Sequence, residues 1–268
     1  RSARVSDVGL FLSKEGSRMR KLTLLPLAVS VNLIIGGAAW GEGVELVSKV
    51  EELNIIKLSD LPEGPAAIPE EDSRWACVRS ADDITTAAGS LVSSKNWLVT
   101  SEVEHLEFTF VSFVGGAERG TGGTCLLHDG NIGIFRGASL LGLIYGDRTM
   151  EQSIGRVHEL TGDRLRIWNG DYLGTPIADL QIVESDLIIV RDVAERDIFC
   201  DGQSSVPNIY GLEFQLARKF LFAEGWEAGP PNVEELDSFY DGIREKFPEL
   251  VTCSGTGVGY CAYKYSKG

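Results

Sequence analysis

The stretch RVHELTGDRLRIWNGDYLGTPIADLQIVESDLIIV, residues 156–190, decides the fold class of this sequence. Runs rich in Val, Ile, Leu and Trp alternate in it with the turn-forming triplets TGD, NGD and ESD. Short apolar runs closed by Gly, Asn, Asp and Ser predict strands joined by tight connections. Because no helical pattern separates these runs, we expect an antiparallel meander, barrel or sandwich rather than parallel βαβ units.

The same pattern extends towards the N-terminus as far as Trp75, so we assign residues 75–200 to an antiparallel β-rich domain. The run LEFTF at 106–110 alternates apolar and polar residues, which is typical of a strand with one buried face. The run CLLH at 125–128 is followed by Asp129-Gly130. An Asp-Gly pair between two apolar runs predicts a two-residue hairpin turn.

Segments of different character lie on either side of this domain. Residues 42–74 are rich in Glu, Asp and Pro and predict an acidic linker. Residues 201–268 predict a small α+β domain. Its first helix has an apolar face formed by Leu212, Leu216, Ala217, Phe220 and Leu221 and ends at Gly225. A second helix is expected between Asn232 and Pro248, which makes the whole chain an α+β protein.

The chain is acidic throughout. It has 268 residues, with 25 Lys and Arg against 39 Asp and Glu, and a net charge of −14. A length of this order predicts one or two domains. Such a charge repels a phosphate backbone, so we expect no nucleic-acid partner.

An export signal is predicted near the N-terminus. The basic cluster Arg18-Met19-Arg20-Lys21 precedes an uncharged run from Leu22 to Gly41, which matches the n-region and h-region of a signal peptide. Cleavage is expected after Gly41 or after Ala39. An uncleaved membrane anchor is the alternative, because 20 uncharged residues can just span a bilayer. Residues 1–18 lie upstream of Met19 and are set apart from the fold.

Residues 1–41 thus form an upstream segment with a signal peptide. Without them 19 basic and 37 acidic groups remain, a net charge of −18. We therefore expect a bacterial protein that is periplasmic or extracellular, with no stable membrane span after cleavage. Its oligomeric state stays open.

All five cysteines lie in the exported part, where disulfides are the expected state. Cys253 and Cys261 bracket a glycine-rich turn and are expected to pair. The other three cysteines allow three pairings with one thiol left over. Of these, Cys125–Cys200 is preferred because both residues flank the same β-rich stretch, and Cys77 then has no assigned partner. A zinc site is not expected, because no C-x-x-C occurs and the three histidines are far apart.

Residues 206–229, VPNIYGLEFQLARKFLFAEGWEAG, resemble a PASTA module. The resemblance rests on a strand at Val206-Pro207, a turn at Gly211, a helix carrying Ala217-Arg218, and Gly225 before the next strand. It implies an extracytoplasmic module that binds cell-wall fragments or serves as a spacer. Only one copy is present, whereas the family usually occurs in tandem. The rest of the chain is similar only in general character to uncharacterised exported bacterial proteins.

The motifs of common catalytic sites are absent from the sequence. There is no G-x-S-x-G, no H-E-x-x-H and no G-x-x-x-x-G-K-[ST]. The sequence therefore predicts no catalytic residue, cofactor or metal ligand. An envelope hydrolase that uses a pair of carboxylates stays open as an alternative, as does a structural spacer.

Aromatic side chains are the remaining candidates for recognition, because they offer flat contact surfaces for sugars or for a protein partner. The candidate binding residues are Trp168, Tyr172, Tyr210 and Trp226. We therefore expect a non-catalytic binding protein of the cell envelope, whose partner is a cell-wall or protein ligand.

Overall fold

A computed structural model describes residues 43–65, 77–120, 124–160, 164–170, 174–199, 202–229, 240–253 and 260–267. The expected signal peptide, residues 1–41, lies outside these ranges. No helix among the described residues is long and apolar enough to cross a membrane.

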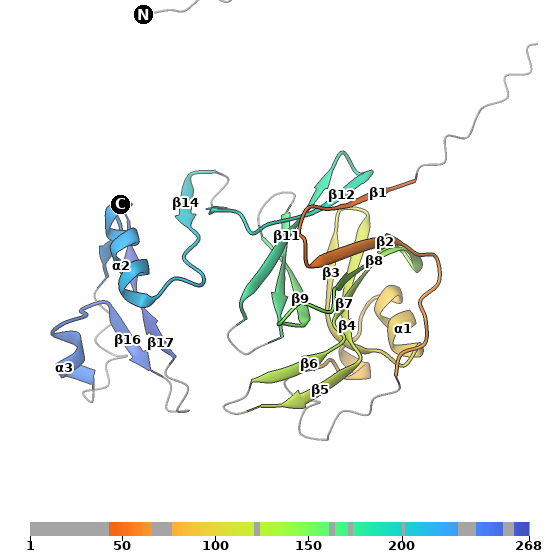
Figure 1. The fold of residues 1–268 in the computed structure, drawn as a ribbon, viewed down its shortest axis with the longest axis horizontal. Helices are drawn as coiled ribbons and strands as arrows, with labels where there is room; N and C mark the ends of the chain where they lie inside the picture. The colour runs from red at the N-terminus through yellow and green to blue at the C-terminus, as the bar shows by residue number, and fades with distance from the viewer. Residues whose placement is uncertain are drawn as a thin grey trace, which may run out of the picture. The chain divides into compact units, whose positions relative to one another are not determined.

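Two five-stranded sheets dominate the structure, which confirms the β-rich prediction (Figure 1). The first sheet has the order β1 (Glu45–Ser48), β12 (Leu187–Arg191), β11 (Pro176–Val183), β10 (Arg164–Asn169) and β9 (Ile154–Glu159). The second has the order β2 (Leu53–Lys57), β8 (Ser139–Gly146), β7 (Asn131–Arg136), β4 (Phe108–Val114) and β3 (Leu98–His105). Within these sheets β1 pairs with β12 in parallel, and every other pairing is antiparallel.

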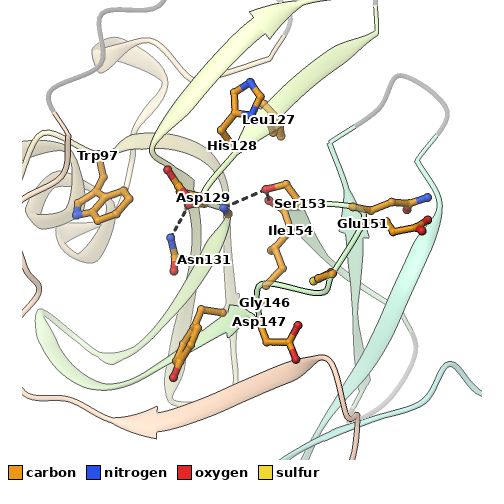
Figure 2. Close-up of a pocket in the computed structure, with 14 residues that line it drawn as sticks. Trp97, Leu127, His128, Asp129, Asn131, Gly146, Asp147, Glu151, Ser153 and Ile154 are labelled. Atoms are coloured by element: carbon orange, nitrogen blue, oxygen red, sulfur yellow. Dashed lines mark hydrogen bonds between the residues drawn. The ribbon is translucent and has the colours of Figure 1, made fainter.

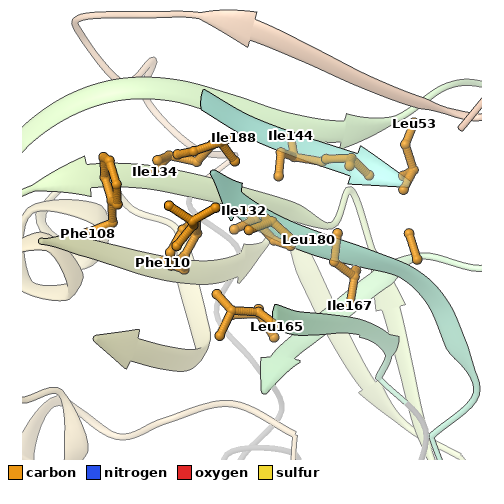
Figure 3. Packing of buried hydrophobic residues seen from close by; sticks show 14 of the residues in the cluster. Leu53, Phe108, Phe110, Ile132, Ile134, Ile144, Leu165, Ile167, Leu180 and Ile188 are labelled. Atoms are coloured by element: carbon orange, nitrogen blue, oxygen red, sulfur yellow. The ribbon is translucent and has the colours of Figure 1, made fainter. Parts of the chain in front are cut away.

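One hydrophobic cluster takes side chains from both sheets (Figure 3). Phe108 and Phe110 on β4 share it with Ile132 and Ile134 on β7, and with Leu165, Ile167, Leu180 and Ile188 on the first sheet. Most of these residues stand two apart on their strands, because alternate side chains of a strand point to the same face. The predicted meander of residues 156–190 supplies one wall of this core.

Side chains join β3 and β9, which no ladder of backbone hydrogen bonds connects in the described sheets. Ser101 accepts a hydrogen bond from the backbone N–H of Val157 at 3.0 Å and donates one to its carbonyl oxygen at 3.3 Å. His105 Nδ1 lies 3.1 Å from Oε1 of Glu159. The two bonds of Ser101 satisfy the backbone N–H and carbonyl oxygen of Val157 on the edge of β9 that faces β3.

A helix covers the other face of the second sheet. α1 (Ala87–Ser94) follows the short 3-10 helix η1 (Ala81–Asp83) and buries Ala88 and Val92 against Val111 and Phe113 of β4. Its N-cap Thr86 accepts a hydrogen bond from the N–H of Gly89 at 2.9 Å. Buried on both faces, β4 reads as the nearly continuous apolar run FTFVSFV.

The prediction of a linker over residues 42–74 is wrong for the part that the structure describes. β1 pairs with β12 and β2 pairs with β8, and Val44 and Leu53 are buried in the shared cluster. These two strands were not predicted, because exposed polar residues such as Glu45 interrupt their apolar pattern. Residues 66–76 lie outside the described residues.

The Asp129-Gly130 pair is not a hairpin turn. β6 (Cys125–His128) pairs with β5 (Gly116–Arg119), whereas β7 pairs with β4 and β8. Asp129 has a φ of 52°, and a Cβ at Gly130 would lie 1.9 Å from the carbonyl oxygen of Ile154. The pair therefore lets the chain leave one sheet and enter another in close contact with the start of β9.

The described residues contain two disulfides, Cys77–Cys125 and Cys253–Cys261. The second agrees with the sequence prediction. The predicted Cys125–Cys200 pair is wrong, because Cys125 is bonded to Cys77; Cys200 itself lies outside the described residues. The Cys125 side chain points into a small buried cluster with Cys77, Val114 and Ala117, which fixes its partner.

The C-terminal part mixes short strands and helices. It contains β13 (Arg196–Phe199), β14 (Ser204–Pro207), α2 (Phe214–Ala223), β15 (Glu227–Ala228), α3 (Asp241–Arg244), β16 (Leu250–Cys253), β17 (Cys261–Tyr263) and β18 (Tyr265–Ser266). The pairs are β13 with β14, β15 with β18, and β16 with β17.

The expected first helix is present as α2. It ends before Gly225, which has a φ of 83°. The second helix was expected between Asn232 and Pro248, and of it the described residues contain only α3 (Asp241–Arg244). Asn232 itself lies outside the described residues. The domain boundary expected at residue 200 falls inside the β13–β14 hairpin.

Candidate functional site

A cavity of about 550 Å³ lies where the ends of β6 and β8 meet the connections that follow them (Figure 2). The β6–β7 connection contributes Asp129 and Gly130, and the β8–β9 connection contributes Asp147, Glu151 and Ser153. A cavity of this volume is in the range of small-ligand sites. We refer to it as the β6–β8 pocket.

One hydrogen bond joins the two connections, and another stabilises the β6–β7 connection itself. The N–H of Gly130 donates to Oγ of Ser153 at 3.0 Å, and Nδ2 of Asn131 donates to the carbonyl oxygen of Asp129 at 2.6 Å, as the dashed lines in Figure 2 show. The close approach of Gly130 to Ile154 adds a second constraint. The pocket wall is therefore organised before any ligand arrives, which reduces the entropic cost of binding.

Asp147 closes a turn at the end of β8. Its Oδ1 accepts hydrogen bonds from the N–H of Thr149 at 2.7 Å and from its hydroxyl at 2.6 Å. Its own N–H donates to the carbonyl oxygen of Glu52 at 2.9 Å. The hydrogen bonds from Thr149 hold the pKa of Asp147 below its usual value, because they favour the charged form.

Aromatic rings form part of the wall. The indole N–H of Trp97 donates to the carbonyl oxygen of Pro62 at 2.8 Å, and its ring makes an edge contact with Phe113 at 5.1 Å between centroids. The ring is thus fixed and its N–H is occupied, so Trp97 offers the pocket only its π surface. Tyr145 at the end of β8 is the second aromatic lining residue.

The charge of the pocket is negative. Asp129, Asp147 and Glu151 line it, and none of the fourteen described lining residues is Lys or Arg. His128 lies at the rim, half exposed, with its Nε2 3.7 Å from Oε1 of Glu118. The pocket consequently favours cationic or neutral polar groups over anions.

The aromatic residues predicted for recognition lie elsewhere. Trp168 and Tyr210 form an edge-to-face pair at 5.6 Å between ring centroids, and the guanidinium of Arg166 lies 5.8 Å from the Trp168 ring. Trp226 follows α2, and its indole N–H is buried without a hydrogen-bond partner among the described residues. None of these three lines the β6–β8 pocket. Tyr172 lies outside the described residues.

Sequence reasoning did not identify the acidic residues of the pocket as parts of one site. The available signal was the connection DRTMEQS, residues 147–153, which is long and polar between two apolar strands. Connections that are longer than a tight turn and lie on a rigid sheet are common places for binding residues. The sequence could not show that this connection would meet Asp129.

A buried carboxylate outside the pocket has a structural role. Oε1 of Glu249 accepts hydrogen bonds from Nε of Arg218 at 2.5 Å and from the hydroxyl of Tyr265 at 3.2 Å. Burial acts to raise the pKa of Glu249, but the bonds from Arg218 and Tyr265 outweigh it and hold the pKa below its usual value. Arg218 also stacks over the Phe222 ring at 4.6 Å. These contacts tie α2 to the strands that follow it.

A second cavity, of about 480 Å³, lies beside Cys77 and is lined by Arg79, Asp83 and Arg156 among others. Its charged groups already serve the fold: Arg79 donates to the carbonyl oxygen of Asp83 at 2.8 Å, and Asp83 accepts from the Ser80 hydroxyl at 2.6 Å. Across the described ranges, no three His, Cys, Asp or Glu side chains gather in a way that could hold a metal ion.

Comparisons with known proteins give no relative for this chain. No protein-family model matches it, and neither the curated proteins nor the solved structures contain a significant match.

Proposed function

We propose that this chain is an exported protein of the bacterial cell envelope that acts by binding a ligand in the β6–β8 pocket. The observation that carries the proposal is the pocket itself, a preorganised cavity with the fixed ring of Trp97 and several polar groups. Preformed cavities of this size with a few placed polar groups are the usual sites of small ligands.

Export is supported by the N-terminal sequence and by the two disulfides. The basic cluster and apolar run of residues 18–41 have the character of a signal peptide. The pairs Cys77–Cys125 and Cys253–Cys261 suit an oxidising compartment such as the periplasm or the cell exterior. A soluble β-rich domain followed by a small α+β domain with its own disulfide is the organisation that we propose.

The cell wall is the partner class that the PASTA-like segment favours. In residues 206–229 the strand β14, Gly211 with a φ of 75°, α2, Gly225 and β15 occur in the order that the resemblance implies. These elements are common and function does not follow from fold. The resemblance therefore serves to choose the wall as the first ligand to test.

The lowered pKa of Asp147 suits a carboxylate that stays ionised and not the general acid of a glycosidase, whose pKa is raised. Asp129 and Glu151 lie in the same pocket, so an envelope hydrolase is the second candidate. A hydrolase would release soluble fragments from the wall, and a binding protein would not.

The test is co-sedimentation of the purified full chain with peptidoglycan sacculi. We expect the protein to pellet with the sacculi, and the variant Asp129→Asn/Glu151→Gln to remain largely in the supernatant. The variant Asp192→Asn/Glu195→Gln is the matched control, because it removes the same charges from exposed positions outside the pocket. Failure of the wild-type chain to pellet would overturn the proposal, and release of soluble wall fragments would favour the hydrolase.

A further inference from the structure

Resting on the proposed function, we infer that the β6–β8 pocket recognises a protonated primary amine. The pocket has three carboxylates and no Lys or Arg among its described lining residues. A primary amine such as a lysine side chain is protonated at neutral pH. An ammonium group therefore supplies the charge that the cavity lacks.

The arrangement of the carboxylates suits one ammonium group with a polar body attached. Figure 2 shows Trp97 on one side of the pocket and Glu151 on the opposite side, with Asp129, Asn131 and Asp147 between them in this view. An ammonium group has three N–H donors and no acceptor, so it needs several acceptors around it. No three carboxylates converge among the described residues, so an ammonium group would meet one carboxylate and the neutral acceptors near it, while the other carboxylates add to the negative field.

The Asn131 amide adds a neutral acceptor. Its Nδ2 is held by the carbonyl oxygen of Asp129 at 2.6 Å, which turns its Oδ1 away from that carbonyl. The amide oxygen thus stays available to a donor from a ligand. An anionic ligand would find no compensating charge in this wall and would be repelled by the carboxylates.

The aromatic rings strengthen the preference for a cation. Because the N–H of Trp97 is bound to Pro62, the ring can interact with a ligand only through its face or edge. A cation over the face of Trp or Tyr is attracted by the ring, and more strongly where it is shielded from water. Trp97 and Tyr145 can therefore favour the ammonium group or the apolar carbons next to it.

Two sources of a primary amine occur in polymers of the envelope class: an amino sugar without its acetyl group, and a lysine-like side chain. Both share the chemistry that the pocket recognises, so the experiment separates them. The probes for titration calorimetry with the full chain are a glucosamine tetramer and a Lys-containing tripeptide. Each is paired with the same compound acetylated on its amines.

We expect at least one amine probe to bind, with its acetylated form at least tenfold weaker. Binding of the sugar probe would identify an amino sugar as the source of the amine, and binding of the peptide probe would identify a lysine-like side chain. Asp129→Asn/Glu151→Gln should weaken binding at least tenfold, while Asp192→Asn/Glu195→Gln should leave it unchanged. Equal affinity for the amine and acetylated forms, or no binding by either amine probe, overturns the inference.

The same logic applies to sacculi and separates this inference from the proposed function. Chemical acetylation of the sacculi should abolish co-sedimentation if the amine is recognised. If untreated and acetylated sacculi pellet the chain equally, the inference is wrong and the binding function stands. If neither pellets it, the proposed function itself is wrong.

Discussion

Arg166 on β10 donates two hydrogen bonds to Asp197 on β13, from Nη1 to Oδ2 at 2.7 Å and from Nη2 to Oδ1 at 2.6 Å. Its Nε and Nη2 donate to Asp179 on β11 at 2.7 and 3.2 Å. The Arg166 side chain is 1% exposed and that of Asp179 is fully buried. The buried guanidinium therefore links the β13–β14 hairpin to the first sheet.

Removing this guanidinium should be strongly destabilising. Arg166→Met leaves Asp179 buried without its main partner, which costs about 3–5 kcal/mol of unfolding free energy. Asp197→Asn keeps a hydrogen-bond acceptor at a less buried position and should cost less. Urea unfolding of the two variants measures the difference, and a loss below about 1 kcal/mol for Arg166→Met would contradict the role described.

The two disulfides should be unequal in their contribution to stability. Cys77 and Cys125 are separated by 48 positions and Cys253 and Cys261 by 8. The entropy of loop closure then predicts a stabilisation of about 4 kcal/mol for the first pair and about 2.5 kcal/mol for the second. Denaturant unfolding of Cys77→Ser/Cys125→Ser and Cys253→Ser/Cys261→Ser tests the order.

Peptide mapping without reduction tests the pairing itself. It should return a Cys77–Cys125 peptide and a Cys253–Cys261 peptide. Recovery of a peptide that joins Cys125 to Cys200 would show that the pairing described here is wrong.

Gly130 should be the least replaceable glycine at the pocket. An added Cβ would lie 1.9 Å from the backbone oxygen of Ile154, so the β6–β7 connection must move. We expect Gly130→Ala to lower stability by about 1–3 kcal/mol and to weaken ligand binding, because the bond to Ser153 is lost. Gly116→Ala is the control, since its Cβ would meet His128 at an ordinary 3.6 Å. Thermal unfolding that ranks the two variants equally would contradict the packing described.

Alkaline pH should loosen the C-terminal part. Burial, and then the charge of Glu249, raise the pKa of Tyr265 to about 12. A raised pKa in the folded state means that the stabilisation is complete below the ordinary value of 10.0 and is lost as the pH rises towards 12. Wild-type stability should therefore fall between pH 10 and 12, and fall less in Tyr265→Phe. Ultraviolet titration of tyrosinate checks the raised pKa of Tyr265. Equal losses of stability in the two proteins between pH 10 and 12 would count against the assignment.

The local parts of the fold could be predicted from the sequence. Residues 156–190 form most of β9 to β12. They could be predicted because neighbouring strands joined by short connections produce an alternation of apolar runs and turn residues within one short stretch of sequence. α2 was recognisable by its spacing and by Gly225. Its apolar face was only partly identified, since Ala217 and Leu221 are buried whereas Leu216 is 53% exposed.

The pairings between distant segments could not be predicted. Glu45 of β1 lies opposite Leu187 of β12, and no local pattern in either strand identifies the other. The pocket has the same origin: Asp129 and Asp147 become neighbours of one cavity only because β6 and β8 end beside each other. The residue types predicted aromatic candidates for binding, whereas the strand pairing brings other residues together in the pocket.

Hydrogen–deuterium exchange of the full chain, with and without soluble peptidoglycan fragments, tests the central claim most directly. Binding in the β6–β8 pocket predicts slower exchange in residues 128–131 and 145–154, with a smaller effect in Asp129→Asn/Glu151→Gln. Protection confined to the PASTA-like residues 206–229, or no protection anywhere, would contradict it.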